Sequence, residues 1–127
     1  MASGDGFSAD QRYEIDRAIR AAEMVCRYEF SVFVGASEGE TGPFSQKLHA
    51  SLIAPERSVL IMVDPAVRLL EVVTGPQAHS VLDDHQIELA VLTMKSAFAA
   101  GDLVGGITHG LQQLAQHAQR PPVRRDR

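Results

Sequence analysis

The sequence predicts a single α/β domain in which a mixed β-sheet of three to four strands is sandwiched between helices. Two patterns indicate this fold class: apolar residues recur at intervals of three and four in several segments, and short apolar runs bounded by glycine or proline lie between those segments. The 127 residues suffice for one core and are too few for two ordinary domains. We expect the domain to span residues 8–119, between a flexible N-terminus (1–7) and a disordered basic tail (120–127).

The first predicted helix follows Ser8, which has the spacing of a capping box with Gln11. An apolar stripe at helical spacing comes next, made of Ile15, Ala18, Ile19, Ala22 and Cys26. Because Cys26 is the only cysteine and lies on this stripe, we expect a buried thiol and neither a disulfide nor a cysteine-based zinc site. The aromatic and β-branched run at residues 30–34 is the first predicted strand.

The middle of the chain predicts a crossover followed by a hairpin. Three glycines make residues 35–43 a loop. A short helix with Pro43 in its first turn carries Phe44, Leu48 and Leu52 at a spacing of four and ends near Ala54 and Pro55. Residues 58–63 are apolar throughout, as in a central strand that is covered on both faces and parallel to the first. Asp64 and Pro65 are expected to start a type I turn, and residues 67–74 to form the third strand.

Two helices are predicted at the C-terminal end of the domain. Their apolar stripes run over residues 87–98 and 104–118. Asp83 and Asp84 before the first helix and Asp102 before the second stand where capping residues belong. The glycines of the last helix, at 105, 106 and 110, favour close packing. We expect Val91, on the first of these stripes, to be essential, so that Val91→Asp prevents folding.

Charge and hydropathy exclude several classes of protein. The formal net charge is −4, and the four arginines and one aspartate of residues 120–127 contribute +3, which leaves −7 on residues 1–119. An acidic body predicts no nucleic-acid binding. No apolar run approaches the roughly 20 residues of a membrane span and no secretory signal is recognisable, so we expect a cytoplasmic protein with no membrane span.

Residues 58–114 carry an ordered set of features: an apolar strand and turn, an arginine-containing strand that ends in glycine, a leucine followed by an aspartate, a helix with an aromatic, and a glycine–aspartate pair. The matching residues are Gly75, Leu82, Asp84, Phe98, Gly101 and Asp102. This tract resembles the TPM domain family, and particularly its compact cytosolic actinobacterial relatives of unknown function. The resemblance implies a mixed sheet between helices, calcium binding in some members and weak phosphatase activity in plant relatives.

Four carboxylates are candidates for one edge of the predicted sheet. The loops after parallel strands emerge at a common edge, which gathers Glu38, Glu40 and Asp64, and the penultimate helix is long enough to bring Asp102 there. Carboxylates suit calcium or magnesium, whereas turn, capping and solvation roles would explain the same residues without a metal. Asp83 and Asp84 are expected one helix length away.

Other motifs are weak. Histidines 49, 79, 85, 109 and 117 have no metal-ligand spacing, so we expect surface or capping roles, and no P-loop or nucleophile elbow is present. The sequence therefore favours a non-enzymatic binding or interaction module, with a divalent cation as a candidate ligand and an unknown protein as a candidate partner. The alternative is a weak metal-dependent phosphomonoester hydrolase in which Asp64 and Asp102 hold the cation.

Overall fold

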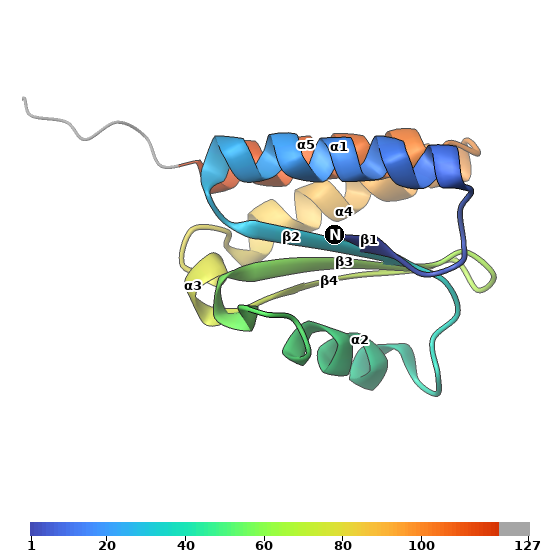
Figure 1. The fold of residues 1–127 in the computed structure, drawn as a ribbon, viewed down its shortest axis with the longest axis horizontal. Coiled ribbons are helices and arrows are strands. Elements are labelled where there is room, and N and C mark those ends of the chain that lie inside the picture. The colour runs from blue at the N-terminus through green and yellow to red at the C-terminus, as the bar shows by residue number, and fades with distance from the viewer. Residues whose placement is uncertain (120–127) are drawn as a thin grey trace, which may run out of the picture.

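The computed structural model describes residues 1–119, which form one four-stranded mixed sheet with helices on both faces (Figure 1). The elements are β1 (Ala2–Ser3), α1 (Ala9–Cys26), β2 (Glu29–Val34), α2 (Thr41–Ala50), the 3-10 turn η1 (Pro55–Arg57), β3 (Ser58–Asp64), β4 (Leu69–Thr74), α3 (Pro76–His79), α4 (Asp84–Ala99) and α5 (Leu103–Ala118). The predicted fold class is confirmed. The predicted basic tail, residues 120–127, lies outside the described residues.

The sheet has the strand order β1-β2-β3-β4, so β3 lies between two partners. It runs parallel to β2, with Phe30 opposite Val59, and antiparallel to β4, with Asp64 opposite Leu69. Every residue of β3 is buried, because α1, α4 and α5 lie on one face of the sheet and α2 lies on the other (Figure 1). The apolar run therefore marks a central strand, as the sequence predicts.

The N-terminal segment pairs with the sheet, contrary to the expectation that residues 1–7 are flexible. Ala2–Ser3 forms β1, parallel to β2, and Ala2 is only 3% exposed. The backbone N–H of Val32 donates to the carbonyl of Met1 (2.8 Å), and that of Gly6 donates to the carbonyl of Val34 (2.8 Å). The segment thus supplies backbone partners along the outer edge of β2, a constraint that leaves no periodic pattern in so short a sequence.

Two predicted boundaries shift. Helix α2 begins at Thr41 and ends at Ala50, so the chain from Ser51 to Arg57 is turn and 3-10 helix rather than α-helix. Strand β4 begins at Leu69 rather than at residue 67, because the turn is built one residue later than predicted. The hydrogen bond that closes the turn runs from the backbone N–H of Arg68 to the carbonyl of Pro65 (3.4 Å), and Arg68 has φ 56°.

The main core lies between the sheet and the layer of α1, α5 and α4, with α5 packed against both other helices. Of the three glycines on α5, Gly106 and Gly110 face α4 closely: an added Cβ would approach the Phe98 ring and the Met94 side chain, respectively. Val91 is only partly buried, which lowers the expected cost of Val91→Asp, and the effect of this change on folding stays a prediction. Ala90 and Met94 are the fully enclosed positions of α4.

Within residues 1–119, no helix combines the length and apolarity that crossing a bilayer would require.

We expect Gly106→Ala to lower the free energy of unfolding by about 1 kcal/mol. Alanine gains about 1 kcal/mol of helix propensity, but its Cβ would lie 2.6 Å from Cε1 of Phe98 and 3.0 Å from Cβ of Ala97. Such overpacking costs about 1 to 3 kcal/mol. Urea unfolding followed by circular dichroism measures the change, with the exposed Gln112→Ala as a helix-surface control that stays near wild type. A Gly106→Ala protein more stable than wild type would show that α4 and α5 are not in close contact.

Candidate ligand site at the rim of the sheet

The rim of interest lies where β2 and β3 end. Asp64, the last residue of β3, is 5% exposed, and its two carboxylate oxygens accept hydrogen bonds from different loops. Oδ2 accepts from the backbone N–H of Ser37 (3.2 Å), and Oδ1 accepts from that of Ala66 (3.2 Å). Both oxygens of this buried carboxylate therefore have backbone partners, and the side chain ties the β2–α2 loop to the β3–β4 turn.

The other three predicted cation ligands have separate surroundings. Asp102 caps α5, with Oδ1 accepting from the N–H of Gly105 (2.9 Å), and Gly105 leaves no room for a Cβ beside that carboxylate. Glu40 stands at the N-cap of α2 without a side-chain cap bond, and Glu38 is exposed. Within residues 1–119, no three His, Cys, Asp or Glu side chains lie where they could hold a metal ion together. The structure therefore does not gather Glu38, Glu40, Asp64 and Asp102 into one cluster.

Asp64 instead borders a cavity of about 470 Å³ between the β3–β4 turn and the junction of α4 with α5. Gly101 and Leu103, the neighbours of Asp102, line the same cavity, so α4 brings the junction to the rim at which β3 ends. Most of the lining is apolar. It comprises Val63, Pro65, Leu69, Leu70, Phe98, Ala99 and Leu103, together with Gly101, Asp64, Arg68 and Lys95.

Two cations, Arg68 and Lys95, border this apolar cavity. Neither forms an ion pair or a side-chain hydrogen bond within residues 1–119, where the only ion pair joins His79 to Asp84. Arg68 has a left-handed backbone, which is uncommon outside glycine and which the end of a tight turn requires here. The site offers an apolar surface next to two available positive charges.

Sequence patterns alone do not single out Arg68 and Lys95, although one indication is present. Lys95 and Phe98 are three residues apart on α4, so they share a helix face, and both line the cavity. The local sequence around Arg68 does not predict that the turn lies near α4, because the two segments are far apart in sequence. Sequence patterns therefore indicate the rim but not its positive charge.

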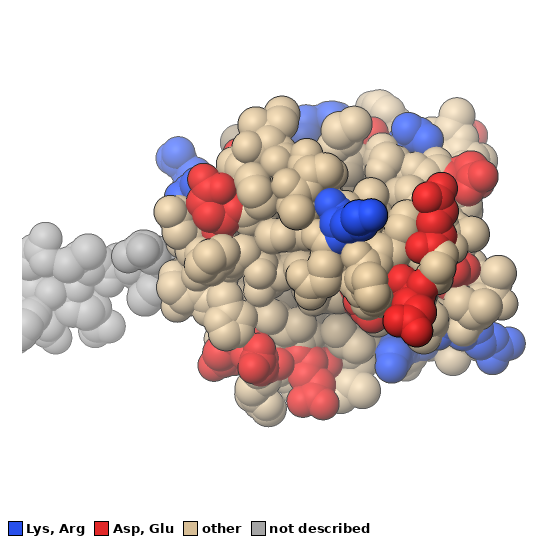
Figure 2. Space-filling view, turned by 90° about the horizontal axis from the view of Figure 1, so that it is seen from below, with Lys and Arg blue, Asp and Glu red and all other residues tan. Residues whose placement is uncertain are grey.

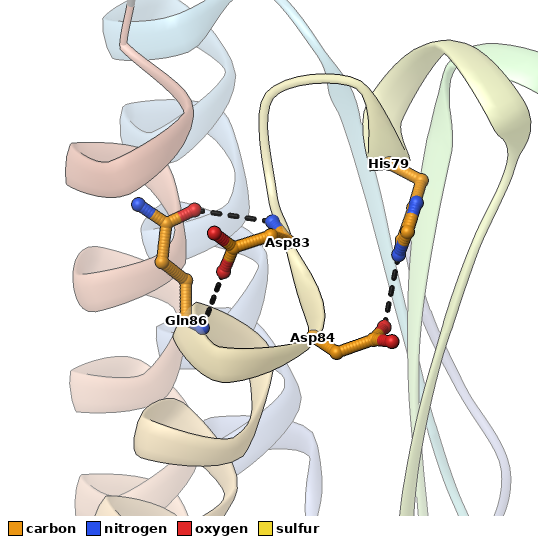
Figure 3. A network of polar contacts seen from close by, with 4 residues as sticks. All are labelled: His79, Asp83, Asp84 and Gln86. Atoms are coloured by element: carbon orange, nitrogen blue, oxygen red, sulfur yellow. Dashed lines mark hydrogen bonds and ion pairs between the residues drawn. The ribbon is translucent and has the colours of Figure 1, made fainter.

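The opposite end of α4 is organised as a helix cap (Figure 3). Asp83 and Gln86 form a capping box, and the Nε2 atom of His79 lies 2.9 Å from Oδ1 of Asp84. The 16 residues of α4 separate this network from Asp102 by about 24 Å. Among the residues that match the TPM pattern, Leu82 is fully buried and Gly75 is too close to the Pro55 carbonyl for any side chain. The two thus have structural roles.

Two further side chains fill structural roles at buried positions. Cys26 is 6% exposed, as predicted, and burial raises the pKa of its thiol. His49 corrects the expectation that every histidine has a surface or capping role, because it is 8% exposed. Its Nε2 lies 2.9 Å from the carbonyl of Ser58 and joins α2 to the start of β3.

Residues 2–115 match the model of a family described as "Domain of unknown function (DUF5130)". Two curated relatives from Mycobacterium tuberculosis, the uncharacterized proteins Rv2468c (strain H37Rv) and MT2543 (strain CDC 1551), are each 26% identical over 101 residues, which are 80% of this chain and 60% of theirs. The matched region thus spans less than two thirds of each relative.

Solved structures share the fold. The BA42 protein of Bizionia argentinensis aligns with a TM-score of 0.80 and 18% identity over 90% of this chain and 82% of its own. The N-terminal domain of the cg2496 protein of Corynebacterium glutamicum aligns with a TM-score of 0.74 and 15% identity over 93% of this chain and 79% of that one. These matches support an uncharacterised domain family, and the finer TPM resemblance stays a prediction from the sequence.

We expect Asp64→Asn to lower the free energy of unfolding by about 1 to 3 kcal/mol. An asparagine side chain offers one acceptor oxygen, so its NH₂ group would face one of the two backbone N–H donors that Asp64 now accepts from. Urea unfolding measures the loss, and hydrogen exchange at the Ser37 and Ala66 amides should speed up. The exposed Glu38→Gln serves as a control with the same change of charge. Equal stability of the two variants would contradict the role given to Asp64.

Proposed function

The chain belongs to the DUF5130 family, and from the geometry of the rim we propose that it is a non-enzymatic binding module whose ligand is a small amphipathic anion. The observation that carries this proposal is the juxtaposition of an apolar cavity with Arg68 and Lys95. The ligand class is an apolar body of modest length with a carboxylate or phosphate head.

The size and lining of the cavity support a small ligand. A volume of about 470 Å³ falls in the range of roughly 300 to 1,000 Å³ typical of small-molecule sites, which are mostly apolar with a few polar groups. Leu69 and Leu70 of β4 supply apolar lining on one element, and Phe98 and Leu103 supply it on the α4–α5 side. Each methylene group that enters contributes about 0.8 kcal/mol of transfer free energy, offset in part by the loss of ligand freedom.

The charge of the lining supports an anionic head group. Arginine presents a planar fork of donors that matches carboxylate and phosphate oxygens, and lysine adds a second positive charge. Asp64 is the acidic member of the lining, and its two oxygens already accept hydrogen bonds from backbone amides. The two cations therefore remain available for the head group.

The metal-dependent phosphatase has less support. It requires a cation held by Asp64 and Asp102, whose carboxylates accept hydrogen bonds from backbone amides, and residues 1–119 contain no group of three metal-ligand side chains. Calcium or magnesium binding stays a prediction from the sequence, and the proposal assigns no catalytic residue.

Calorimetric titration with four octyl compounds tests the proposal. Octanoate and octyl phosphate should bind. Octanol and octyltrimethylammonium, which have the chain of octyl phosphate, one carbon longer than that of octanoate, and no negative charge, should bind more weakly. Lys95→Gln should weaken the binding of both anions on the order of tenfold, because a hydrogen bond to a charged group contributes about 1.5 to 3 kcal/mol. Lys47→Gln removes an exposed cation on α2, outside the cavity, and should have no effect. Equal binding of octanoate and octyltrimethylammonium would refute an anion site.

Arg68→Gly separates ligand binding from stability. Glycine adopts a φ of 56° without the strain of about 1 to 2 kcal/mol that a side chain carries there. We therefore expect the free energy of unfolding to be equal to or higher than that of wild type, while octanoate binding weakens on the order of tenfold. Arg68→Lys keeps a positive charge and should retain part of the affinity. Unchanged octanoate binding by Arg68→Gly would show that Arg68 does not contribute to the anion site.

A further inference from the structure

The second face of the sheet is only partly covered. Helix α2 packs on β3 and β4, where Leu60, Met62 and Val73 form a small core with Phe44 and other apolar side chains of α2 and its continuation. The β1–β2 half of this face lies beside α2 rather than beneath it. Because Phe30, Val32 and Val34 are buried toward the main core, Ser31 and Phe33 alternate with them and point to the α2 side.

A groove of about 500 Å³ occupies this half of the face. Phe33 of β2 lines one wall, and Leu48 and Leu52 line the other. Phe33 also meets Phe44 edge-on, with ring centroids 5.5 Å apart, so its ring is held at the side of the groove. The groove shares no lining residue with the rim cavity, so the inference drawn from it goes beyond the proposed function.

Ile53 marks the mouth of the groove. It lines the groove and its side chain is 100% exposed, which is the largest exposure among the large hydrophobic residues of residues 1–119. A single exposed apolar side chain is ordinary, but Ile53 continues the apolar wall formed by Leu48 and Leu52. An apolar surface with a polar border is typical of sites that bind other proteins.

The charged groups that line the groove indicate the charge of the partner that it would bind. Glu23 and Glu29 are among its lining residues, together with the serines at 3, 31, 51 and 58, and no Lys, Arg or His side chain lines it. The Met1 ammonium group lies there too and donates to the Phe30 carbonyl, so the charged groups of the lining are two carboxylates and one ammonium, with a net charge of −1. Figure 2 looks onto this side of the molecule, where uncharged side chains cover most of the surface, acidic ones gather toward the margins and a basic one stands near the middle. Residues 1–119 as a whole carry −7.

We propose that this groove docks a segment of a partner protein whose apolar side chains are flanked by Lys or Arg. The apolar side chains of the segment contact Phe33, Leu48 and Ile53, and its cations lie next to Glu23 and Glu29. An amphipathic helix laid into an apolar groove is a common form of such recognition.

Titration of the full chain with a short amphipathic leucine–lysine peptide tests this inference by calorimetry and amide NMR shifts. The peptide should bind, with shifts at Ser31, Phe33 and Leu52, and a leucine–glutamate peptide of the same pattern should bind on the order of tenfold more weakly or not at all. Ile53→Asp should weaken binding by a similar factor, while Leu92→Asp, at a 58% exposed position on α4, should not. Glu29→Lys should weaken binding more than Glu88→Lys, which changes the net charge equally at an exposed site on α4.

Three results would overturn the inference: equal binding of both peptides, equal effects of each variant and its control, or self-association of the chain that Ile53→Asp abolishes. The last would identify a second copy as the occupant. Because Lys95→Gln lies outside the groove, it should leave peptide binding unchanged, so failure here is distinguishable from failure of the anion site.

Discussion

The buried carboxylate of Asp64 is the interaction on which the rim of this domain depends. It stands at the end of the central strand, and its two oxygens hold the backbones of Ser37 and Ala66. One of these amides follows β2 and the other lies in the turn before β4, so a single side chain fixes the paths of two loops. Burying a carboxylate is costly unless its oxygens have partners, and here both do. The position of Arg68, two residues beyond Ala66, follows from this arrangement.

The other side of the rim is set by packing rather than by polar contacts. Gly106 and Gly110 let α5 approach α4, and Asp102 fixes the start of α5 through Gly105. The α4–α5 junction is thereby held facing the β3–β4 turn, and the space between them is the cavity that Arg68 and Lys95 border. The proposed ligand site at this rim and the proposed docking groove on the α2 face have no lining residue in common, so each can be altered without the other.

Much of the fold follows from patterns that a sequence displays directly. Helices α1, α4 and α5 have apolar stripes and capping residues, and β3 is apolar throughout because both of its faces are covered. Strand β1 could not be found this way, since two residues have no periodicity. The burial of Ala2 depends on the pairing of β1 with β2 and on packing against the main core. The site was harder to predict than the fold. Asp64 and Asp102 are carboxylates at the expected rim, but whether a carboxylate binds a cation or a backbone amide depends on the loop around it. The meeting of Arg68 with Lys95 depends on packing between segments far apart in the chain.

The position of octyl phosphate in a complex with the full chain, determined from intermolecular NOEs, would locate the ligand site. We expect contacts from the alkyl chain to Leu70 and Phe98, with the head group next to Arg68 and Lys95. Contacts confined to Phe33 and Leu52 on the α2 side, or spread over the surface without a preferred position, would contradict this expectation.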